Sequence, residues 1–546
     1  MSDKIAVIIC VAEKNEYEHI IEELKNAHIP EGYSVDIMVY PTARDKAKNF
    51  NNAIQGTDAK YKIFFNSPVE RINCNIFKEV VNYFTIEPFI GIMGILGSEL
   101  PIDADYSNAE KLYGAYYKYV GDRYEFVGTD NPLFYQSVSM LDSNFFAISS
   151  DLLFDGNVGE FFLLPAYCCT LKQKGLKSIV VMQNENNLWM TLKEDCDYQK
   201  AHVDPRYKIQ LEDFYRRYNK YFLPLVSILI PSYNNTFFLK DALESAIGQS
   251  YPNIEIMVGD DSTTDDVKSF IEPYLNAHDN IIFYHHGGPL GGRGINNINF
   301  LLEKSNGEFI KLLFHDDVLT DDSIYEMMKY YVKDLDCKIG LVTSVREAID
   351  EQGVVVGTVS PWIPNKDLIV PPEELIRKVL YSNYNFIGEY STVLVRKRYF
   401  WVPELNSYRI GYYKGFIDRH MGDVSSWLML SSKGLDCLFI KKRLSYFRLH
   451  RNQNTYNPNI QVGSILDWYA LCLLSYNYKG AHSQSDECFY IIKRMNEQLK
   501  IFNFAHDEEF DLMYTQYKKI QEFLLENNKD MVFKLVENYI KNNSTC

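Results

Sequence analysis

Val226-Ser-Ile-Leu-Ile-Pro-Ser-Tyr-Asn234 is an apolar run of strand length that ends abruptly in polar residues. Two later stretches repeat this design, Ile254-Glu-Ile-Met-Val-Gly-Asp-Asp-Ser262 and Ile310-Lys-Leu-Leu-Phe-His-Asp-Asp317. An open α/β sheet binds its ligand at the carboxyl ends of its strands, which is where these carboxylates fall. Two acidic strand ends in one sheet predict a pocket for a metal-bound diphosphate.

The segments between and after these runs alternate between helix and strand patterns. Leu239–Ile247 and Asn297–Lys304 repeat apolar residues at helical spacing, and Ile339–Ser344 is an apolar run of strand length. Alternating strands and helices indicate βαβ units, which build a parallel sheet. We therefore predict an α/β, Rossmann-like domain over residues 224–455.

A second domain of the same class is predicted over residues 1–205, followed by a linker at 206–223. Its expected strands are Lys4–Val11, Val35–Tyr40, Tyr61–Phe65 and Phe89–Leu96, with a helix at Glu16–Ala27. The stretch Lys60–Val69 stands in this half where Phe309–Val318 stands in the other, and both halves have the same order of elements. We infer an internal duplication at the level of the fold.

The two copies differ in chemistry. Ser67 and Pro68 stand where the second copy has Asp316 and Asp317, and Pro41-Thr42-Ala43 follows the second strand in place of an acidic pair. Proline offers no side-chain ligand, and serine is a poor ligand for a hard cation. We expect a structural or acceptor-binding role for the first domain, with a divergent active site as the alternative.

Residues 456–546 form the last predicted part, a helical C-terminal extension. Helical patterns with polar faces occupy Ile465–Tyr476, Cys488–Leu499, Asp507–Asn527 and Lys529–Lys541. Packing on the preceding domain, oligomerisation and acceptor contact are all consistent with such an extension, and a homo-oligomer stays open.

The length and composition of the chain limit the number of domains and the kinds of partner that we expect. A chain of 546 residues is long enough for roughly three or four compact units. The net charge of −16 argues against a nucleic-acid backbone or an anionic membrane surface as the main partner. No apolar run reaches the roughly 18–20 residues of a transmembrane helix. The apolar run after Lys4 is typical of a buried strand rather than a signal peptide, and the scattered cysteines indicate free thiols. We therefore expect a cytoplasmic protein.

The second half resembles the family 2 glycosyltransferases, which have the GT-A fold. Pro224–Asn235 is similar to the family's opening strand and turn, and Val258-Gly-Asp-Asp-Ser-Thr-Thr-Asp265 resembles its Val-Asp-Asp-Gly-Ser-Thr-Asp segment. Gly307–Leu319 resembles the run into its Asp-x-Asp metal motif. Ile387-Gly-Glu-Tyr-Ser391 and Asp423-Val-Ser-Ser-Trp427 are similar to segments of one bacterial branch. The first half more weakly resembles a GT-A-like domain that lacks the metal motif.

The resemblance assigns the donor nucleotide to the ends of the first two strands of the second domain. Asp260 and Asp261 would accept hydrogen bonds from the uracil N–H and the ribose hydroxyls. Pro231, Tyr233 and Asn234 would line the base and ribose pocket. The alternative is that the two carboxylates cap the next helix and that the other three residues form an ordinary turn.

The same resemblance assigns the diphosphate to the next loop and helix. Arg293 lies in the loop Gly287-Gly-Pro-Leu-Gly-Gly-Arg-Gly294, where a forked guanidinium can hold a diphosphate, and a plain surface loop is the alternative. Asn297 and Asn299 resemble an Asn-Trp-Asn pair of the bacterial branch.

Asp316 is the expected ligand of a divalent metal, Mn²⁺ or Mg²⁺. A small hard cation typically takes one or two carboxylates together with substrate phosphate oxygens. Phe314 stands where the family has the first Asp of its motif, and the bacterial branch often has histidine where His315 stands. His450 would complete the metal sphere or touch phosphate, with a structural role as the alternative. A solvated turn is the alternative for Asp316 and Asp317.

Asp423 is the expected general base. The resemblance places it at the family's distal acidic position near the acceptor, where a carboxylate that takes the hydroxyl proton allows inversion at the anomeric carbon. Asp418 and Glu389 are alternatives for this role, and Glu389 and Trp427 are expected on the acceptor side.

These assignments predict an inverting, metal-dependent glycosyltransferase that moves a sugar from a UDP-sugar to a hydroxyl of a protein or glycan acceptor. N-acetylglucosamine is assumed as the sugar because it is common, and a flagellin, an adhesin or a lipid-linked glycan would fit as acceptor. The alternative is a catalytically inactive scaffold that binds nucleotide-sugar or glycan. A sugar-1-phosphate nucleotidyltransferase is disfavoured, because Pro231-Ser-Tyr-Asn234 does not resemble the glycine-rich loop that opens that class.

Overall fold

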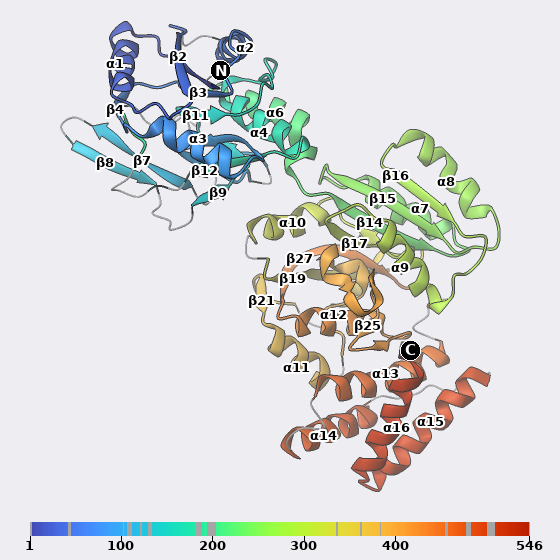
Figure 1. The fold of residues 1–546 in the computed structure, drawn as a ribbon. Helices are drawn as coiled ribbons and strands as arrows, with labels where there is room; N and C mark the ends of the chain where they lie inside the picture. Colours follow the sequence, from blue (N-terminus) through green and yellow to red (C-terminus); the bar gives the residue numbers. More distant parts are fainter. Residues whose placement is uncertain are drawn as a thin grey trace. The chain divides into compact units, whose positions relative to one another are not determined.

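The computed structural model describes residues 3–41, 45–101, 103–105, 112–120, 123–128, 134–181, 183, 188–193, 204–334, 337–360, 363–382, 384–451, 453, 457–476, 482–498 and 508–544. The chain divides into two compact units, Met1–Leu223 and Pro224–Cys546, and each is an α/β fold (Figure 1). Four residues that the sequence predictions include, Thr42, Ala43, Leu499 and Asp507, lie outside the described residues.

Seven strands form the main sheet of the first unit. They are β1 Asp3–Ile9, β2 Tyr33–Val39, β3 Tyr61–Phe65, β5 Ile90–Gly94, β9 Tyr135–Ser137, β11 Phe145–Ile148 and β12 Lys177–Val181. Their order is β2-β1-β3-β11-β5-β12-β9. β1 runs parallel to β2 and β3, β11 is antiparallel to both its neighbours, and β12 is parallel to β5.

Helices pack on both faces of this sheet. They are α1 Lys14–Lys25, α2 Lys46–Gln55, α3 Ile76–Ile86 and α4 Leu163–Gln173. Leu24 of α1 and Phe84 of α3 join one core with the strands, whereas Phe50 of α2 packs edge-on against Phe64 and Phe146. A six-stranded sheet completes the unit, from β4 Val69–Ile72, β6 Leu96–Ser98, β7 Tyr113–Val120, β8 Arg123–Gly128, β10 Met140–Leu141 and β13 Met190–Leu192.

Residues 206–223 belong to the first unit, which corrects their prediction as a linker. Tyr207–Phe222 form helix α6, and its Phe214 is fully buried and stacks on Phe162 with ring centroids 4.9 Å apart. The hydroxyl of Tyr218 donates to Asp155 at 2.9 Å. Aromatic residues at 214, 218 and 222 repeat at helical spacing, and this pattern marks an amphipathic helix that a linker would not need.

The second unit is built on a ten-stranded sheet. Eight strands follow the order β16-β15-β14-β17-β22-β19-β27-β18, and β20 and β21 pair with β19 and β27. Their bounds are β14 Val226–Ser232, β15 Ile254–Asp260, β16 Ile281–His285, β17 Phe309–Leu312, β18 Val318–Leu319, β19 Ile339–Ile349, β20 Val355–Thr358, β21 Leu368–Val370, β22 Leu394–Arg396 and β27 Asp436–Arg448. Every residue of β14 is buried, as expected for a parallel strand covered on both faces.

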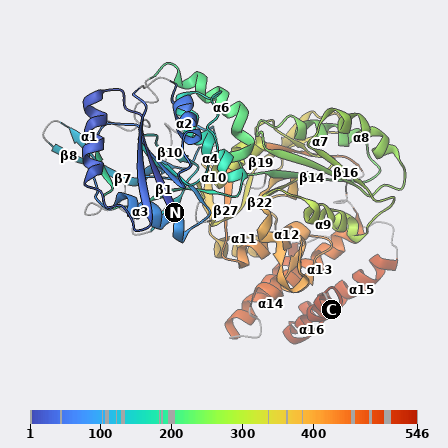
Figure 2. The same ribbon diagram turned by 45° about the horizontal axis from the view of Figure 1, so that its top comes forward.

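Helices again cover this sheet, and α7 and α8 lie alongside β14 and β16 (Figure 2). The helices are α7 Phe237–Ile247, α8 Asp266–Ala277, α9 Ile295–Lys304, α10 Ser323–Lys333, α11 Pro372–Ser382 and α12 Gly422–Ser432. Two short hairpins precede α12, formed by β23 Trp401–Val402, β24 Ser407–Tyr408, β25 Tyr412–Tyr413 and β26 Phe416–Ile417.

The two units share one topology. The first contains the strand order β2-β1-β3-β11-β5-β12, and the second contains β15-β14-β17-β22-β19-β27. The parallel and antiparallel senses of the paired strands match at every position of these two series. The duplication predicted from the sequence is therefore present in the fold.

Four helices form the C-terminal part, gathered together in Figure 1. They are α13 Pro458–Ser475, α14 His482–Gln498, α15 Glu508–Leu525 and α16 Lys529–Asn542. Leu466 of α13 and Val536 of α16 belong to the same hydrophobic core as Trp427 of α12 and Phe416 of β26. The helical extension is thus packed into the second unit. Among the described helices, none is long and apolar enough to cross a membrane.

Candidate active site

Strands β14 and β15 bring the predicted nucleotide residues together at their carboxyl ends. Ser232 pairs in register with Asp260. Pro231 is buried inside β14, because the strand extends two residues beyond the apolar run, whereas Tyr233 just after it is 50% exposed. Of these residues, Tyr233 therefore presents an open aromatic surface beside the acidic strand end.

Asp260 is fully buried and already holds two partners. Its Oδ1 accepts a hydrogen bond from the Ser262 N–H at 3.0 Å, and its Oδ2 lies 2.8 Å from Nδ1 of His285. The Ser262 hydroxyl in turn accepts from the N–H of Asn234, which adopts a left-handed backbone with φ 48°. Asp260 and Asn234 thus shape the turn, and His285 is a partner that sequence analysis missed.

Asp261 differs from Asp260 because one of its carboxylate oxygens has no hydrogen-bond partner. Its N–H donates to the Ser232 carbonyl at 3.0 Å, and its Oδ1 is buried without a hydrogen-bond partner. Burial raises the pKa of Asp261, opposed by the Leu290 N–H and by the charge of His286. An unsatisfied buried acceptor costs about 1–3 kcal/mol, so this oxygen is suited to a donor that a ligand brings.

The glycine-rich loop has several residues with positive φ, and the polar side chains of the loop and of the helix α9 that follows it have partners on the protein. Arg293 is exposed with φ 55°. Burial raises the pKa of Asp467 to about 6, and the charge of Arg293 counteracts this rise, so the two groups are near each other. Asn297 is buried and donates to the Gly259 carbonyl at 2.8 Å, which makes it a brace for β15. Asn299 accepts from the Ile410 N–H at 2.9 Å.

Asp316 lies beside His450 at the carboxyl end of β17. The Oδ2 of Asp316 is 3.0 Å from Nε2 of His450, and both side chains retain some exposure, 22% and 11%. Burial raises the pKa of Asp316, but the His450 hydrogen bond and the charge of His315 outweigh it, so the pKa stays below its ordinary value. Two residues 134 apart in the chain thus form one carboxylate–imidazole pair.

Asp317 is a structural partner of this pair. It is buried, and its Oδ1 accepts from the Arg448 N–H at 3.1 Å, while the Arg448 guanidinium donates to the Asp316 carbonyl at 2.9 Å. Burial, together with the neighbouring Asp316, raises the pKa of Asp317 well above its ordinary value. Beneath it, burial lowers the pKa of Lys311 to about 7. Arg448 fixes the turn, and its place two residues before His450 was the only sequence signal for it.

Asp316 and His450 fit a divalent metal as a partial ligand set. An ionised carboxylate suits Mn²⁺ or Mg²⁺, and an imidazole is a common ligand of transition metals. No group of three or more His, Cys, Asp or Glu side chains in the described part of the chain is arranged around a common metal position. Two protein donors leave the other coordination positions to substrate phosphate oxygens and water, as in many phosphate-binding metal sites.

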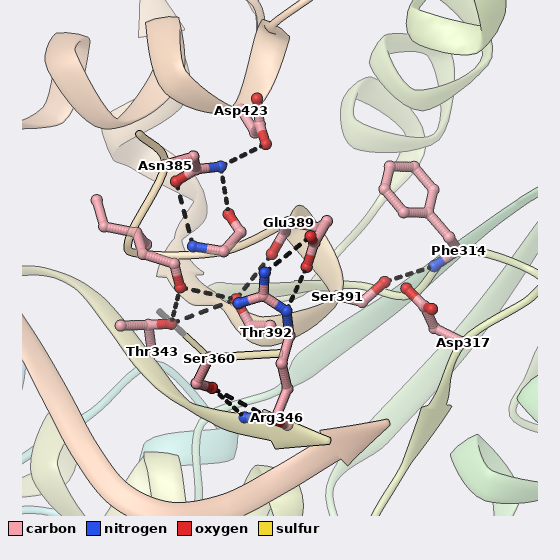
Figure 3. Close-up of polar contacts among 12 residues, drawn as sticks. Phe314, Asp317, Thr343, Arg346, Ser360, Asn385, Glu389, Ser391, Thr392 and Asp423 are labelled. Carbon is pink, nitrogen blue, oxygen red and sulfur yellow. Dashed lines mark hydrogen bonds and ion pairs between the residues drawn. The ribbon is translucent and has the colours of Figure 1, made fainter. Parts of the chain in front are cut away.

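Asp423 stands at the start of α12, partly exposed. Its Oδ1 accepts from the Val424 N–H at 2.8 Å, and its Oδ2 accepts from the Asn385 side-chain amide at 2.7 Å (Figure 3). Burial raises the pKa of Asp423 to about 7, with smaller contributions from Glu389 and Asp418. A carboxyl group that titrates near neutral pH is well matched to general-base catalysis.

The two alternative bases are committed elsewhere. Glu389 forms a two-point ion pair with Arg346, at 2.8 and 2.9 Å (Figure 3). Asp418 is fully buried, and its Oδ1 accepts from the N–H groups of His420 and Met421 at 3.0 and 2.7 Å. Glu389 is thus neutralised by a guanidinium and Asp418 is shut off from solvent, whereas Asp423 is partly exposed and its two hydrogen-bond donors are neutral groups.

Trp427 does not face an acceptor, which corrects its predicted position. It is fully buried, its indole N–H donates to the Gly388 carbonyl at 3.3 Å, and its ring packs edge-on against Tyr390. A side chain without accessible surface can only support the loop above it.

Equivalent positions of the first unit lack these functional groups. The run Lys174-Gly-Leu176 follows α4 as Lys433-Gly-Leu435 follows α12, and this register puts Leu164 at the position of Asp423. Ser67, at the position of Asp316, donates to the side chain of Asn144 at 2.5 Å. The first unit retains the sheet without the carboxylates.

Family comparisons match both units. Residues 227–393 match the family described as "Glycosyl transferase family 2", and residues 6–218 match one described as "Glycosyltransferase like family".

Individual relatives match shorter stretches. An uncharacterized glycosyltransferase of Rickettsia felis is 32% identical over 154 residues, which are 28% of this chain and 24% of that protein. A Campylobacter jejuni protein named GalNAc(5)-diNAcBac-PP-undecaprenol beta-1,3-glucosyltransferase is 30% identical over 111 residues, 20% of this chain and 34% of its own. This chain therefore spans about a quarter to a third of the length of these relatives.

Among solved structures, S. aureus TarS aligns over 56% of this chain and 50% of its own, with 14% identity and a TM-score of 0.38. That likeness is too loose to bear on function. The family matches and the two α/β sheets agree, however: the chain belongs to the family 2 glycosyltransferases and carries two GT-A-like domains.

Proposed function

We propose that this chain is an inverting, metal-dependent glycosyltransferase that moves a sugar from a UDP-sugar to a hydroxyl group of a protein or glycan acceptor. The observation that carries the proposal is the setting of Asp423. It is a partly exposed carboxylate with a pKa of about 7, joined through the loop of residues 385–391 to the turn that holds Asp316. A carboxylate that titrates near neutral pH can take the proton of an acceptor hydroxyl as that hydroxyl attacks the sugar.

The donor nucleotide would bind at the ends of β14 and β15. The Oδ1 of Asp261, which has no hydrogen-bond partner on the protein, would accept from the uracil N–H or from a ribose hydroxyl, and the fully buried Asp260 would hold the turn that presents it. Tyr233, half exposed next to them, offers a ring face to the base. Arg293 would contribute charge near the diphosphate from the glycine-rich loop.

Asp316 and His450 would hold a divalent cation together with the diphosphate oxygens of the substrate. When bound, such a cation stabilises the charge that develops on the departing nucleoside diphosphate. The Arg448 guanidinium donates to the Asp316 backbone carbonyl and its N–H donates to the Asp317 carboxylate, so the turn that carries Asp316 is held in place before the substrate arrives.

Asp423 would perform the proton transfer. As the acceptor oxygen forms its bond to the anomeric carbon, its proton passes to the carboxylate of Asp423. The bond from that carbon to the diphosphate breaks on the opposite face, and UDP leaves with the electron pair. Displacement from opposite faces inverts the anomeric configuration.

The acceptor would be a hydroxyl group of a glycan or of a protein. The name of the Campylobacter relative describes transfer to a lipid-linked glycan, which supports a glycan acceptor, while a flagellin or adhesin is the protein alternative. N-acetylglucosamine is the first donor sugar to test. The eight cysteines among the described residues are free thiols, which supports placing the reaction in a reducing cytoplasm.

A non-catalytic binding role is the second candidate, and we assign it to the first unit. Ser67, Pro68 and Leu164 replace the residues that would carry the metal and the base. A scaffold role for the whole chain, with nucleotide-sugar or glycan bound and no turnover, is the outcome that the experiment below must exclude.

The test is release of UDP from donor with water as the acceptor. The full chain is incubated with UDP-, GDP- and dTDP-sugars, with Mn²⁺ or with EDTA. Asp423→Asn is compared with Asp279→Asn, an exposed carboxylate that precedes β16, at the opposite end of that strand from His285. We expect metal-dependent hydrolysis of a UDP-sugar that falls about 10²–10⁴-fold in Asp423→Asn and persists in Asp279→Asn. Binding of UDP without any turnover would support the scaffold instead.

A further inference from the structure

We propose that Asn385 is a positioning residue for sugar transfer, whose side-chain amide fixes the Asp423 carboxylate that takes the acceptor proton. The inference rests on the proposed function, because it takes Asp423 as the general base. It goes beyond the family assignment, since Asn385 contacts neither the nucleotide residues nor the metal pair.

The amide of Asn385 is fully used. Its Nδ2 donates one hydrogen to Asp423 Oδ2 at 2.7 Å and the other to the Gly388 carbonyl at 2.9 Å. Its Oδ1 accepts the Gly388 N–H at 3.2 Å. A carboxamide has two donor hydrogens, and both are committed here, so the amide has one orientation.

The turn that Asn385 closes is rigid. Gly388 has φ +107°, and a Cβ at this position would lie 2.5 Å from Arg346 Nη1 and 2.7 Å from Thr392 Oγ1. Only glycine combines that backbone conformation with such a close approach. The Trp427 indole donates to the same Gly388 carbonyl, which adds a buried anchor beneath the turn.

The far side of the segment 385–392 is pinned to strand β19. Thr343 Oγ1 donates to the Ile387 carbonyl at 2.8 Å, and Arg346 holds Glu389 by two contacts (Figure 3). Thr343 and Arg346 are themselves buried in the sheet. Asn385 is thus attached to a fixed framework, and a donor on a fixed framework determines where the Asp423 carboxylate points.

The last part of the segment reaches the metal turn. The Ser391 hydroxyl accepts the Phe314 N–H at 3.0 Å, and Asp317 lies beside it (Figure 3). The same eight-residue segment therefore holds the base at one end and the turn after β17 at the other. It sets the separation between the proton acceptor and the Asp316–His450 pair.

The charges around Asp423 define what Asn385 contributes. Glu389 and Asp418 are the acidic groups that raise the pKa of Asp423 after burial, Arg346 is engaged with Glu389, and Tyr390 lies close enough to feel the Asp423 charge. A hydrogen bond donated to a carboxylate favours its charged form. The hydrogen bond that the neutral Asn385 donates therefore favours the ionised form of Asp423, against the effect of the nearby negative charges.

The experiment is the pH profile of UDP-sugar hydrolysis by the full chain, with water as the acceptor, for wild type, Asn385→Ala and Asn385→Asp. Thr343→Val is the matched control, because it removes a contact to the same segment without touching Asp423. Calorimetric binding of UDP with Mn²⁺ verifies that each variant is folded at its donor site.

For Asn385→Ala, we expect the acidic limb of kcat to move up by about one pH unit, which is about a tenfold loss below neutrality. The side chain of Asn385→Asp has the same shape but cannot donate a hydrogen bond to Asp423 at neutral pH. This variant should therefore move the acidic limb of kcat upward at least as far as Asn385→Ala. Thr343→Val should lower thermal stability and leave the midpoint in place, and UDP affinity should stay within about twofold in all three.

The outcomes separate this inference from the proposed function. If wild type neither binds UDP nor hydrolyses any sugar nucleotide, the proposed function fails. If wild type turns over and Asp423→Asn does not, but both Asn385 variants keep the wild-type midpoint, Asn385 is not the positioning residue. A shift in Thr343→Val equal to that in Asn385→Ala would attribute the effect to loop rigidity alone and overturn the proposal.

Discussion

The carboxylate of Asp467 on α13 accepts a hydrogen bond from Nδ1 of His420 at 2.8 Å, and also from the His420 backbone N–H at 3.2 Å. His420 lies three residues before Asp423, in the loop that leads into α12. The second oxygen of Asp467 accepts the hydroxyl of Tyr539 on α16 at 2.6 Å. Two C-terminal helices thus hold the loop that presents the proposed base, so this extension contributes directly to the site.

Tyr539→Phe should weaken this connection while preserving the packing of the ring. The buried carboxylate of Asp467 would lose a donor, and a hydrogen bond to a buried charged group is worth about 1–3 kcal/mol. We expect the free energy of unfolding, measured in urea, to fall by that amount, together with a lower kcat for UDP-sugar hydrolysis. Tyr490→Phe, at a side chain that is 60% exposed, is the control. Equal stability of the two variants would argue against the Asp467 contact.

Asp418→Asn should reduce the loss of folding stability that wild type shows as the pH rises above neutrality. Burial, and then the charge of Asp467, raise the pKa of Asp418 well above its ordinary value. A carboxyl group with a raised folded-state pKa stabilises the fold below its unfolded pKa, and that stability is lost as pH rises through the folded value. Asparagine resembles the protonated form: its oxygen can still accept the His420 and Met421 N–H groups, and its amide can donate toward Asp467.

We therefore expect the thermal unfolding midpoint of Asp418→Asn to exceed that of wild type above neutral pH and to approach it at pH 5. Asp279→Asn, at an exposed carboxylate, should follow the wild-type curve. A variant that is less stable than wild type at every pH would mean that Asp418 is ionised in the folded protein.

The sequence predicted the acidic strand ends because each is a local pattern. Asp260 and Asp316 come at or just after the ends of apolar runs of strand length. The alternation of strands and helices indicates a parallel sheet, and the carboxyl ends of its strands lie together at one edge. Helix α6 was missed as a domain element for a different reason. Its aromatic spacing was present, but the position between two domains favoured a linker interpretation.

The supporting residues could not be read from the sequence. Asn385 and Asp423 are 38 positions apart, Asp316 and His450 are 134 apart, and their contacts depend on how the chain crosses the sheet. Trp427 shows the converse, since a local motif placed it correctly in the chain but could not say which way its ring points. Burial in the core decided that, because α12 is covered by neighbouring elements on every side.

Asp316→Ala should abolish the effect of Mn²⁺ on hydrolysis. The ionised carboxylate is the stronger of the two proposed metal donors, and His450→Ala should produce a smaller loss because one imidazole is easier to replace by water. We expect Asp316→Ala to match the EDTA-treated wild type, with His450→Ala needing more Mn²⁺ for half-maximal rate. The control is Asp279→Ala. Full Mn²⁺ response in Asp316→Ala would move the metal site elsewhere.

Ser67→Ala should leave hydrolysis unchanged, although Ser67 occupies the position of Asp316 in the duplicated sheet. Its hydroxyl is buried and donates to Asn144, so its removal costs about 1 kcal/mol of stability through that one hydrogen bond. The first unit has Leu164 at the position of Asp423, so it has no general base there. It therefore holds no second active site that Ser67→Ala could damage. The measurement is the metal-dependent rate of UDP release beside the urea midpoint of the same preparation. If the rate falls by more than the fraction of unfolded protein explains, the first unit takes part in the chemistry. The first unit would then need a donor site of its own.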